Sequence, residues 1–202
     1  MSDRHLDTAS TEELMSRFRE WLTEAERTEP SDPNAMALAT VDPEGRPSVR
    51  MVLLKGFDAR GFVFYTNLGS QKARELAANS QAALCFHWKS LDRQVRVQGP
   101  AFSVSDEEAD TYFASRPRDS SLGAWASKQS QAMAGRFALE QRIAKYALKF
   151  NFGAIPRPPF WSGFRSAPQQ IEFWKAKPFR LHERVLYTRD ESDRWSASML
   201  FP

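Results

Sequence analysis

A series of short apolar segments, separated by turn residues, occupies residues 35–102. Each segment has the length of a β-strand and is too short for a typical helix. In the last of them, Val95 and Val97 alternate with Gln94, Arg96 and Gln98. Such alternation places one face of a strand on the core and the other in water, as in antiparallel sheets. The chain is therefore predicted to be mainly β.

The turn and capping residues set the expected elements. Strands are predicted at residues 35–41, 48–54, 62–66, 81–88, 94–102, 170–174, 181–188 and 195–200. Helices are predicted to follow caps at Ser10 or Thr11, at Ser70 and at Ser105, with a longer helix at about 131–146. We expect one domain over residues 1–202, an α+β barrel or sandwich with helical additions and a loose arm over about 1–10.

Composition excludes several classes of function. The 28 Lys and Arg residues against 25 Asp and Glu leave a net charge of only +3, which is not typical of a nucleic-acid-binding protein. The single cysteine, Cys85, rules out an intrachain disulfide, and three scattered histidines give no metal-ligand spacing. We find no membrane-spanning apolar run and no signal-peptide pattern, and we expect a cytoplasmic protein without a metal or a membrane partner.

Two segments carry cations close to strand ends. Arg50 and Lys55 are five residues apart, so they point to opposite faces of one strand unless it bends or ends between them. On opposite faces, Arg50 and Lys55 would bind two different anions. The alternative is that they are two exposed residues at the ends of the strand. At residues 65–72 a strand, a turn with Gly69 and a helix start follow one another, and Lys72 adds charge where backbone N–H groups attract phosphate.

A third segment combines Tyr112, Arg116 and Ser120. Tyr112 and Arg116 are four residues apart and share one face if the helix continues to Pro117. Together with Ser120 they are expected to form a phosphate-binding site, in which the arginine guanidinium donates two parallel hydrogen bonds. The alternative is a helix end at which the arginine satisfies the last carbonyl groups.

A fourth segment places Arg180, His182 and Arg184 on one face if residues 181–188 are a strand. Three such groups repel one another unless they meet an anion or water. His182 is able to titrate near neutral pH. The alternative is an exposed, charged edge strand.

Taken together, ordered segments of this chain resemble the pyridoxine/pyridoxamine 5′-phosphate oxidase family. The segments are Arg50 to Lys55, Phe64 to Asn67, Arg93 to Val95, Tyr112 to Pro117, Ser127 to Ser130, Glu172 to Trp174 and Arg180 to His182. The resemblance implies an FMN-binding split β-barrel of antiparallel, Greek-key type that works as a homodimer. It also implies hydride transfer from a B6 phosphate to FMN, with O2 as the final acceptor and H2O2 released.

The resemblance also assigns roles to residues. The flavin phosphate would be held by Arg50, Lys72, Gln129 and Ser130, with Gln71 where the family commonly has a basic residue. The ribityl chain and ring would contact Met51, Val52, Leu53, Leu54, Lys55, Tyr65 and Thr66, and, from the second subunit or the far side, Gln94, Trp174 and Arg184. The substrate phosphate would be bound by Lys55, Tyr112, Arg116 and Ser120. Arg180 and His182 would lie over the pyridine ring as the catalytic pair.

Two other functions fit the same residues. One is a flavoenzyme of the same fold that acts on another substrate, and the other is an FMN-binding protein without catalytic activity. The chain departs from the family's usual C-terminal Arg-Leu-x-Pro with Met199-Leu200-Phe201-Pro202, and no Arg/Tyr pair precedes Leu14.

Overall fold

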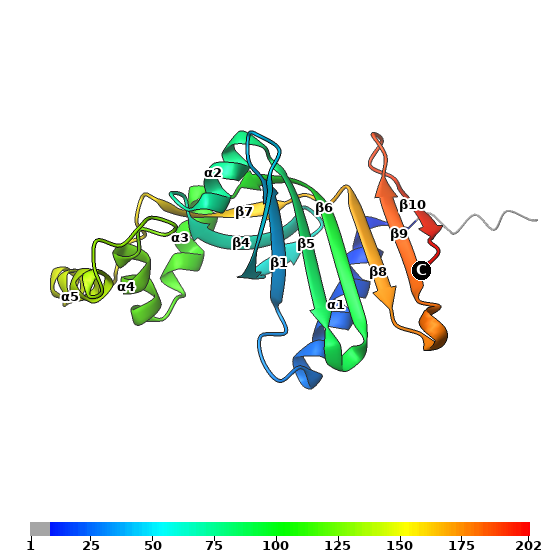
Figure 1. The fold of residues 1–202 in the computed structure, drawn as a ribbon, viewed down its shortest axis with the longest axis horizontal. Coiled ribbons are helices and arrows are strands. Elements are labelled where there is room, and N and C mark those ends of the chain that lie inside the picture. Colours follow the sequence, from blue (N-terminus) through cyan, green and yellow to red (C-terminus); the bar gives the residue numbers. More distant parts are fainter. Residues whose placement is uncertain (1–8) are drawn as a thin grey trace, which may run out of the picture.

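The computed structural model describes residues 9–202, so most of the expected N-terminal arm lies outside the described residues. One curled sheet organises the fold, and every strand pair in it is antiparallel, as predicted (Figure 1). Its main path runs β10-β9-β8-β6-β5-β1-β2, and β3, β4 and β7 form a branch that returns to β6. The strands are β1 Ala35–Val41, β2 Pro47–Leu53, β3 Gly56–Asp58, β4 Gly61–Asn67, β5 Gln81–Trp88, β6 Arg93–Ser103, β7 Trp161–Ser166, β8 Gln170–Lys175, β9 Glu183–Arg189 and β10 Trp195–Met199.

Strand β6 is where the sheet divides. Its first part, Arg93 to Gln98, pairs with β8, and its end, Ala101 to Ser103, pairs with β7. Gly99 lies at the switch, and a Cβ there would come within 2.1 Å of the Ala167 carbonyl oxygen. Only glycine allows the backbones to approach so closely. The sheet therefore curls around its inner face at this point.

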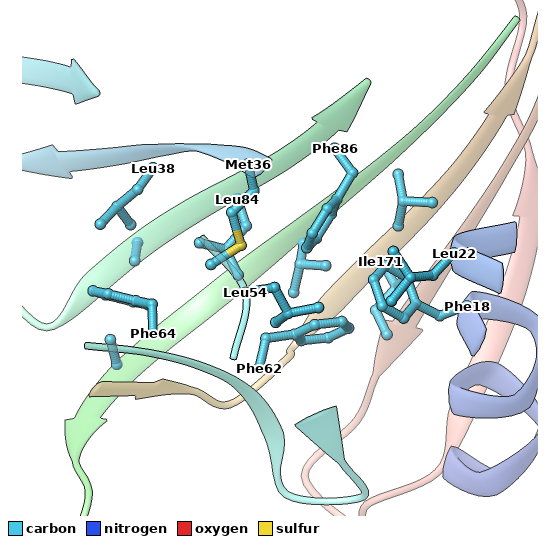
Figure 2. Packing of buried hydrophobic residues seen from close by; sticks show 14 of the residues in the cluster. Phe18, Leu22, Met36, Leu38, Leu54, Phe62, Phe64, Leu84, Phe86 and Ile171 are labelled. Atoms are coloured by element: carbon cyan, nitrogen blue, oxygen red, sulfur yellow. The ribbon is translucent and has the colours of Figure 1, made fainter. Parts of the chain in front are cut away.

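The inner face holds an aromatic core that helix α1, Thr11–Thr28, covers (Figure 2). Ser10 caps the helix and forms a capping box with Glu13. Phe18 is fully buried and makes edge contacts with Phe62 and Phe86, with ring centroids 4.9 Å apart in both cases. Such edge-to-face pairs add to the free energy that burial alone supplies.

The remaining helices are α2 Gln71–Ala78, α3 Asp106–Ala114, α4 Arg118–Ala126 and α5 Ala138–Lys149. In Figure 1, α3, α4 and α5 gather at one end of the molecule and β8–β10 lie at the other. Across residues 9–202, none of the helices combines the length and apolar character that a membrane crossing needs.

Several predicted boundaries were wrong. The helix predicted at 131–146 begins only at Ala138, and α4 and β7 were not predicted at all. Pro117, interpreted as a helix end, is the N-cap of α4. The strand predicted from residue 181 begins at Glu183, because Pro178–Arg180 forms a short 3-10 turn in which Phe179 and Arg180 have positive φ.

Candidate active site

A cavity of about 590 Å³ lies where the branch strands meet helices α3 and α4. Its lining comes from β2, β4, α2, the α3–α4 segment, the residues after α4 and β7. The residues that line it are Met51, Val52, Leu53, Lys55, Tyr65, Thr66, Asn67, Lys72, Tyr112, Arg116, Pro117, Ser120, Ala124, Ser127, Gln129 and Trp161. Most of the residues assigned to the flavin and to the substrate phosphate thus share one cavity.

Lys72 is one of the two partly or fully buried cations that line this cavity. Its side chain is buried, and Nζ donates only a long hydrogen bond, 3.3 Å, to Thr66 Oγ1. Burial and then the neighbouring Arg50 lower the pKa of Lys72, while Glu75 opposes the shift. Within residues 9–202, no carboxylate lies within ion-pair distance of Lys72. An ammonium group in this state favours a bound anion.

Gln129 and Ser130 lie close to Thr66 and to the start of helix α2, which carries Lys72. Thr66 Oγ1 lies 3.3 Å from Gln129 Oε1, and the backbone N–H of Gln71 donates to Ser130 Oγ at 3.2 Å. The 127–130 segment is therefore held against the first turn of α2.

Arg116 is the second of these cations. It follows the last turn of α3, and Nη2 donates to the Ser120 carbonyl oxygen at 3.0 Å. Nη1 is buried and has no hydrogen-bond partner in the described part of the chain. Burial lowers the pKa of Arg116, an effect that Tyr112 partly opposes. Since α3 ends at Ala114, Arg116 reaches the cavity from the turn and not, as predicted, from a continuous helix face.

Three nearly parallel rings, those of Tyr65, Tyr112 and Trp161, also line the cavity. Tyr65 lies 4.0 Å from Tyr112 and 5.3 Å from Trp161 by ring centroids, with interplanar angles of 10° and 3°. Burial, and then the Glu108 carboxylate, raise the pKa of Tyr65 to about 12. Tyr65 is therefore a neutral phenol over the ordinary pH range.

Arg50 does not line the cavity. Its Nη2 contacts Glu75 Oε2 at 3.1 Å, and its Nη1 donates to Thr40 Oγ1. Burial acts to raise the pKa of Glu75, but hydrogen bonds from Thr40, Ser48, Gln71 and Arg50 lower it to about 2. Arg50 is thus already paired within the chain. Leu54, another residue predicted to contact the flavin, also does not line the cavity and is part of the buried core.

The remaining predicted residues lie beside a second hollow of about 190 Å³, between β6, β8 and β9. Gln94, Trp174, His182 and Arg184 line it. Arg184 forms a double ion pair with the buried Glu172, at 2.8 and 3.2 Å. The His182 ring lies 4.7 Å from the Trp174 ring.

Arg180 is exposed on the 3-10 turn before β9 and is not part of the lining of this hollow. The prediction that Arg180, His182 and Arg184 share one strand face was wrong, because the strand starts after His182. His182 and Arg184 nevertheless line the same hollow.

The two hollows are separated within one chain. Strand β2 is at one end of the main sheet path, whereas β8 and β9 lie beyond β1, β5 and β6. The sequence predicted both groups of residues, and the family resemblance placed Gln94, Trp174 and Arg184 on the second subunit or the far side of the flavin. The sequence missed Trp161 and Glu75, since a buried tryptophan after prolines and a helix glutamate carry no signal of their own. In the described part of the chain, no three His, Cys, Asp or Glu side chains gather as metal ligands.

Comparison with known proteins gives consistent matches over the whole length. Residues 22–150 match the family model described as "Pyridoxamine 5′-phosphate oxidase". Residues 161–202 match the model described as "Pyridoxine 5′-phosphate oxidase C-terminal dimerisation region". A relative from Rhodospirillum rubrum, called pyridoxine/pyridoxamine 5′-phosphate oxidase, is 64% identical over 190 residues, which cover 92% of this chain and 94% of the relative.

Solved structures share the fold. PhzG from Burkholderia lata, in complex with tetrahydrophenazine-1-carboxylic acid, has a TM-score of 0.87 and 33% identity over 94% of this chain and 92% of its own. A pyridoxamine 5′-phosphate oxidase-related, FMN-binding protein from Nostoc punctiforme has a TM-score of 0.76 and 20% identity, over 93% of this chain and 96% of its own. The expected split-barrel fold is thereby confirmed.

Proposed function

The chain belongs to the pyridoxamine 5′-phosphate oxidase family, and we propose that it oxidises pyridoxamine and pyridoxine 5′-phosphates to pyridoxal 5′-phosphate with bound FMN. The balanced reactions consume one O2 and release one H2O2, and the amine additionally takes up water and releases ammonia. FMN supplies the redox chemistry, because it accepts a hydride and passes two electrons to O2.

The observation that carries this proposal is the pair of uncompensated cations, Lys72 and Arg116, that line one cavity. Lys72 and Arg116 are both partly or fully buried, and neither has a carboxylate partner within residues 9–202. FMN and a B6 phosphate are both phosphate monoesters, so a ternary complex needs two separate anion sites. The cavity has the size of ordinary small-ligand sites.

The surroundings of Lys72 fit the flavin phosphate. The buried ammonium of Lys72 supplies charge and N–H donors, and Gln129, Ser130 and the first turn of α2 lie beside it. Met51, Val52 and Leu53 along β2, with Tyr65 and Thr66 on β4, would then line the ribityl chain and ring. Arg50 would act from outside the cavity lining, where Glu75 holds it.

The surroundings of Arg116 fit the substrate phosphate. Arg116 has no carboxylate partner in the described residues, and Lys55, Tyr112 and Ser120 line the cavity with it. Binding both phosphates in one cavity orients the pyridine ring against the flavin, and such orientation contributes much of the rate enhancement in two-reactant sites.

We infer that the second hollow completes the site of another copy of the chain. Gln94, Trp174, His182 and Arg184 lie across the sheet from the cavity, and residues 161–202 match a dimerisation region. In a homodimer, His182 and the exposed Arg180 would reach the partner's cavity and lie over the pyridine ring. There the Arg180 guanidinium would stabilise negative charge on the substrate, and the His182 ring would lie beside it.

Oxygen uptake by the FMN-loaded protein tests the proposal. Pyridoxamine 5′-phosphate should cause O2 consumption with equal formation of H2O2 and pyridoxal 5′-phosphate. The PhzG relative gives a specific alternative, since its bound ligand carries a carboxylate and no phosphate. O2 uptake with a reduced phenazine carboxylate, and none with either B6 phosphate, would favour that alternative.

A further inference from the structure

We propose that Trp161 is a positioning residue for the substrate phosphate, because its ring holds the Arg116 guanidinium and the Tyr112 ring at the cavity that all three residues line. This inference rests on the proposed function for the identity of the ligand. The contacts that carry it do not depend on that identity.

The first contact is between the indole and the guanidinium. Arg116 Cζ lies 4.7 Å from the centroid of the Trp161 ring, and the Phe113 ring lies 5.4 Å from the same atom. Trp161 is only 6% exposed, so little water competes for the guanidinium face. A cation over a tryptophan face is stabilised most among the aromatic residues, and more strongly where water is excluded.

The second observation is that the contact with the indole uses none of the hydrogen-bond donors of Arg116. Arg116 is buried enough to lower its pKa, yet it has no ion pair within residues 9–202, and its Nη1 has no hydrogen-bond partner there. A carboxylate in place of the indole would stabilise the charge but would occupy the fork and repel a phosphate. The indole face stabilises the cation without consuming a single N–H donor.

The third contact fixes the tyrosine. Trp161 is parallel to Tyr65 and Tyr112, with interplanar angles of 3° and 7°. The Tyr112 ring is thus held by its two parallel neighbours, which fixes where its hydroxyl oxygen lies. Trp161 therefore orders two of the groups that grip the phosphate.

Strand β7 places Trp161 there. It pairs with Asn67 at the end of β4, and its carbonyl oxygen accepts a hydrogen bond from Arg157 Nη1 at 2.9 Å. Phe164, three residues along the same strand, is equally buried at 6% exposure but packs in the main core against Phe64. Phe164 is therefore a matched control for a merely structural role.

The test compares Trp161→Leu and Trp161→Phe in the FMN-loaded enzyme, each in the wild-type and the Arg116→Ala background. We expect Trp161→Leu to raise the KM for pyridoxamine 5′-phosphate about tenfold with kcat changed less than about twofold. Trp161→Phe keeps a weaker ring face, so its KM should rise about two- to threefold. In the Arg116→Ala background both effects should disappear, because the partner of the ring is absent.

Binding of inorganic phosphate to the same FMN-loaded proteins gives a readout that does not require turnover. Trp161→Leu should weaken phosphate binding by the same factor as the KM, and Phe164→Leu should lower stability with phosphate binding unchanged. If the wild type oxidises no B6 phosphate, the proposed function fails, but the phosphate titration still decides the role of Trp161.

Three results would overturn the inference. They are an unchanged KM and phosphate affinity in Trp161→Leu, losses that remain the same size in the Arg116→Ala background, and equal losses in the Phe164→Leu control. If Trp161→Leu does not fold, Trp161→Phe with its double variant supplies the same comparison.

Discussion

The cations Lys72, Arg116 and Arg50 differ in a way that the residue type does not reveal. Arg50 is paired with the buried Glu75, whereas Lys72 and Arg116 are without a carboxylate partner in residues 9–202. A buried cation that lacks a partner is costly until an anion binds, and the anion then recovers that cost as binding free energy. The unpaired cations, not the most obvious arginine, are therefore the ones on which ligand affinity should depend most.

Replacing Lys72 by methionine should weaken FMN binding by about 10- to 100-fold, since one charge-assisted hydrogen bond to phosphate is lost while the side-chain length is kept. Quenching of flavin fluorescence on binding measures the Kd. Lys145→Met, at an exposed position on α5, is the matched control and should leave the Kd unchanged. An equal Kd for both variants would remove Lys72 from the phosphate site.

Glu75 gives a prediction for the pH dependence of stability. Its pKa is lowered in the folded protein from 4.5 to about 2, so its contribution is full above pH 4.5 and is lost as the pH falls from there through 2. Glu75→Gln should therefore cost on the order of 2 kcal/mol of unfolding free energy at pH 7, and less at pH 3.

Urea unfolding of the wild type and of Glu75→Gln at the two pH values measures this difference. Glu44→Gln, at an exposed turn, serves as the control for removing a carboxylate. A difference between wild type and Glu75→Gln that is the same at pH 7 and pH 3 would contradict the assignment.

Among the secondary-structure elements, β7 shows what a single strand contributes to the site. Gly163 pairs with Tyr65 across the β4–β7 ladder, and a Cβ at Gly163 would lie 2.7 Å from the Tyr65 ring. Gly163→Ala should therefore displace Tyr65 from its stack with Tyr112 and weaken FMN binding severalfold. The Kd for FMN measures the effect.

Gly123→Ala on α4 is the matched control, because a Cβ there meets no atom within 4 Å. In a helix this change should stabilise the protein by about 0.5–1 kcal/mol and leave the Kd for FMN unchanged. A Gly163→Ala variant with the wild-type Kd would show that the Tyr65 ring does not contact the flavin.

The sequence was sufficient for elements with a regular pattern and insufficient for those that tertiary contacts determine. The alternation of Val95 and Val97 predicted both the strand and its buried face. Strand β7 is buried on both faces and contains Gly163, so it has neither alternation nor high β propensity. Helix α4 was missed because Pro117 is its N-cap and not the end of the preceding helix.

The site follows the same division. Residues 50–55, 65–72 and 112–120 were predicted as anion-binding segments, and the structure brings most of them to one cavity. Trp161 joins them only because β7 pairs with β4, a contact between residues about a hundred positions apart. The ion pair of Arg50 with Glu75 is equally non-local, so the sequence alone did not show that Arg50 is already neutralised.

The whole molecule sets the last condition, because the two halves of the candidate site lie across the sheet from each other. If a homodimer joins them, each site combines Lys72 of one subunit with Arg180 of the other. Lys72→Met and Arg180→Ala homodimers should then both be weakly active. Random mixing of the two should restore about a quarter of the wild-type activity, since half of the dimers contain one intact site out of two.

Activity of mixed and unmixed samples, measured after subunit exchange at an FMN concentration that saturates the wild type but not Lys72→Met, tests this arrangement. A mixture of the wild type with the Lys72→Met/Arg180→Ala double variant is the control for subunit exchange. Mixed Lys72→Met and Arg180→Ala samples that stay at the activity of the separate variants would place both residues in the site of a single chain.

The absorption spectrum of the FMN-loaded protein, before and after anaerobic addition of pyridoxamine 5′-phosphate, tests the central proposal most directly. We expect the absorbance of oxidised flavin in the blue region of the spectrum to fall as pyridoxal 5′-phosphate forms, and to return when O2 is admitted. A flavin spectrum that stays oxidised with both B6 phosphates would contradict it.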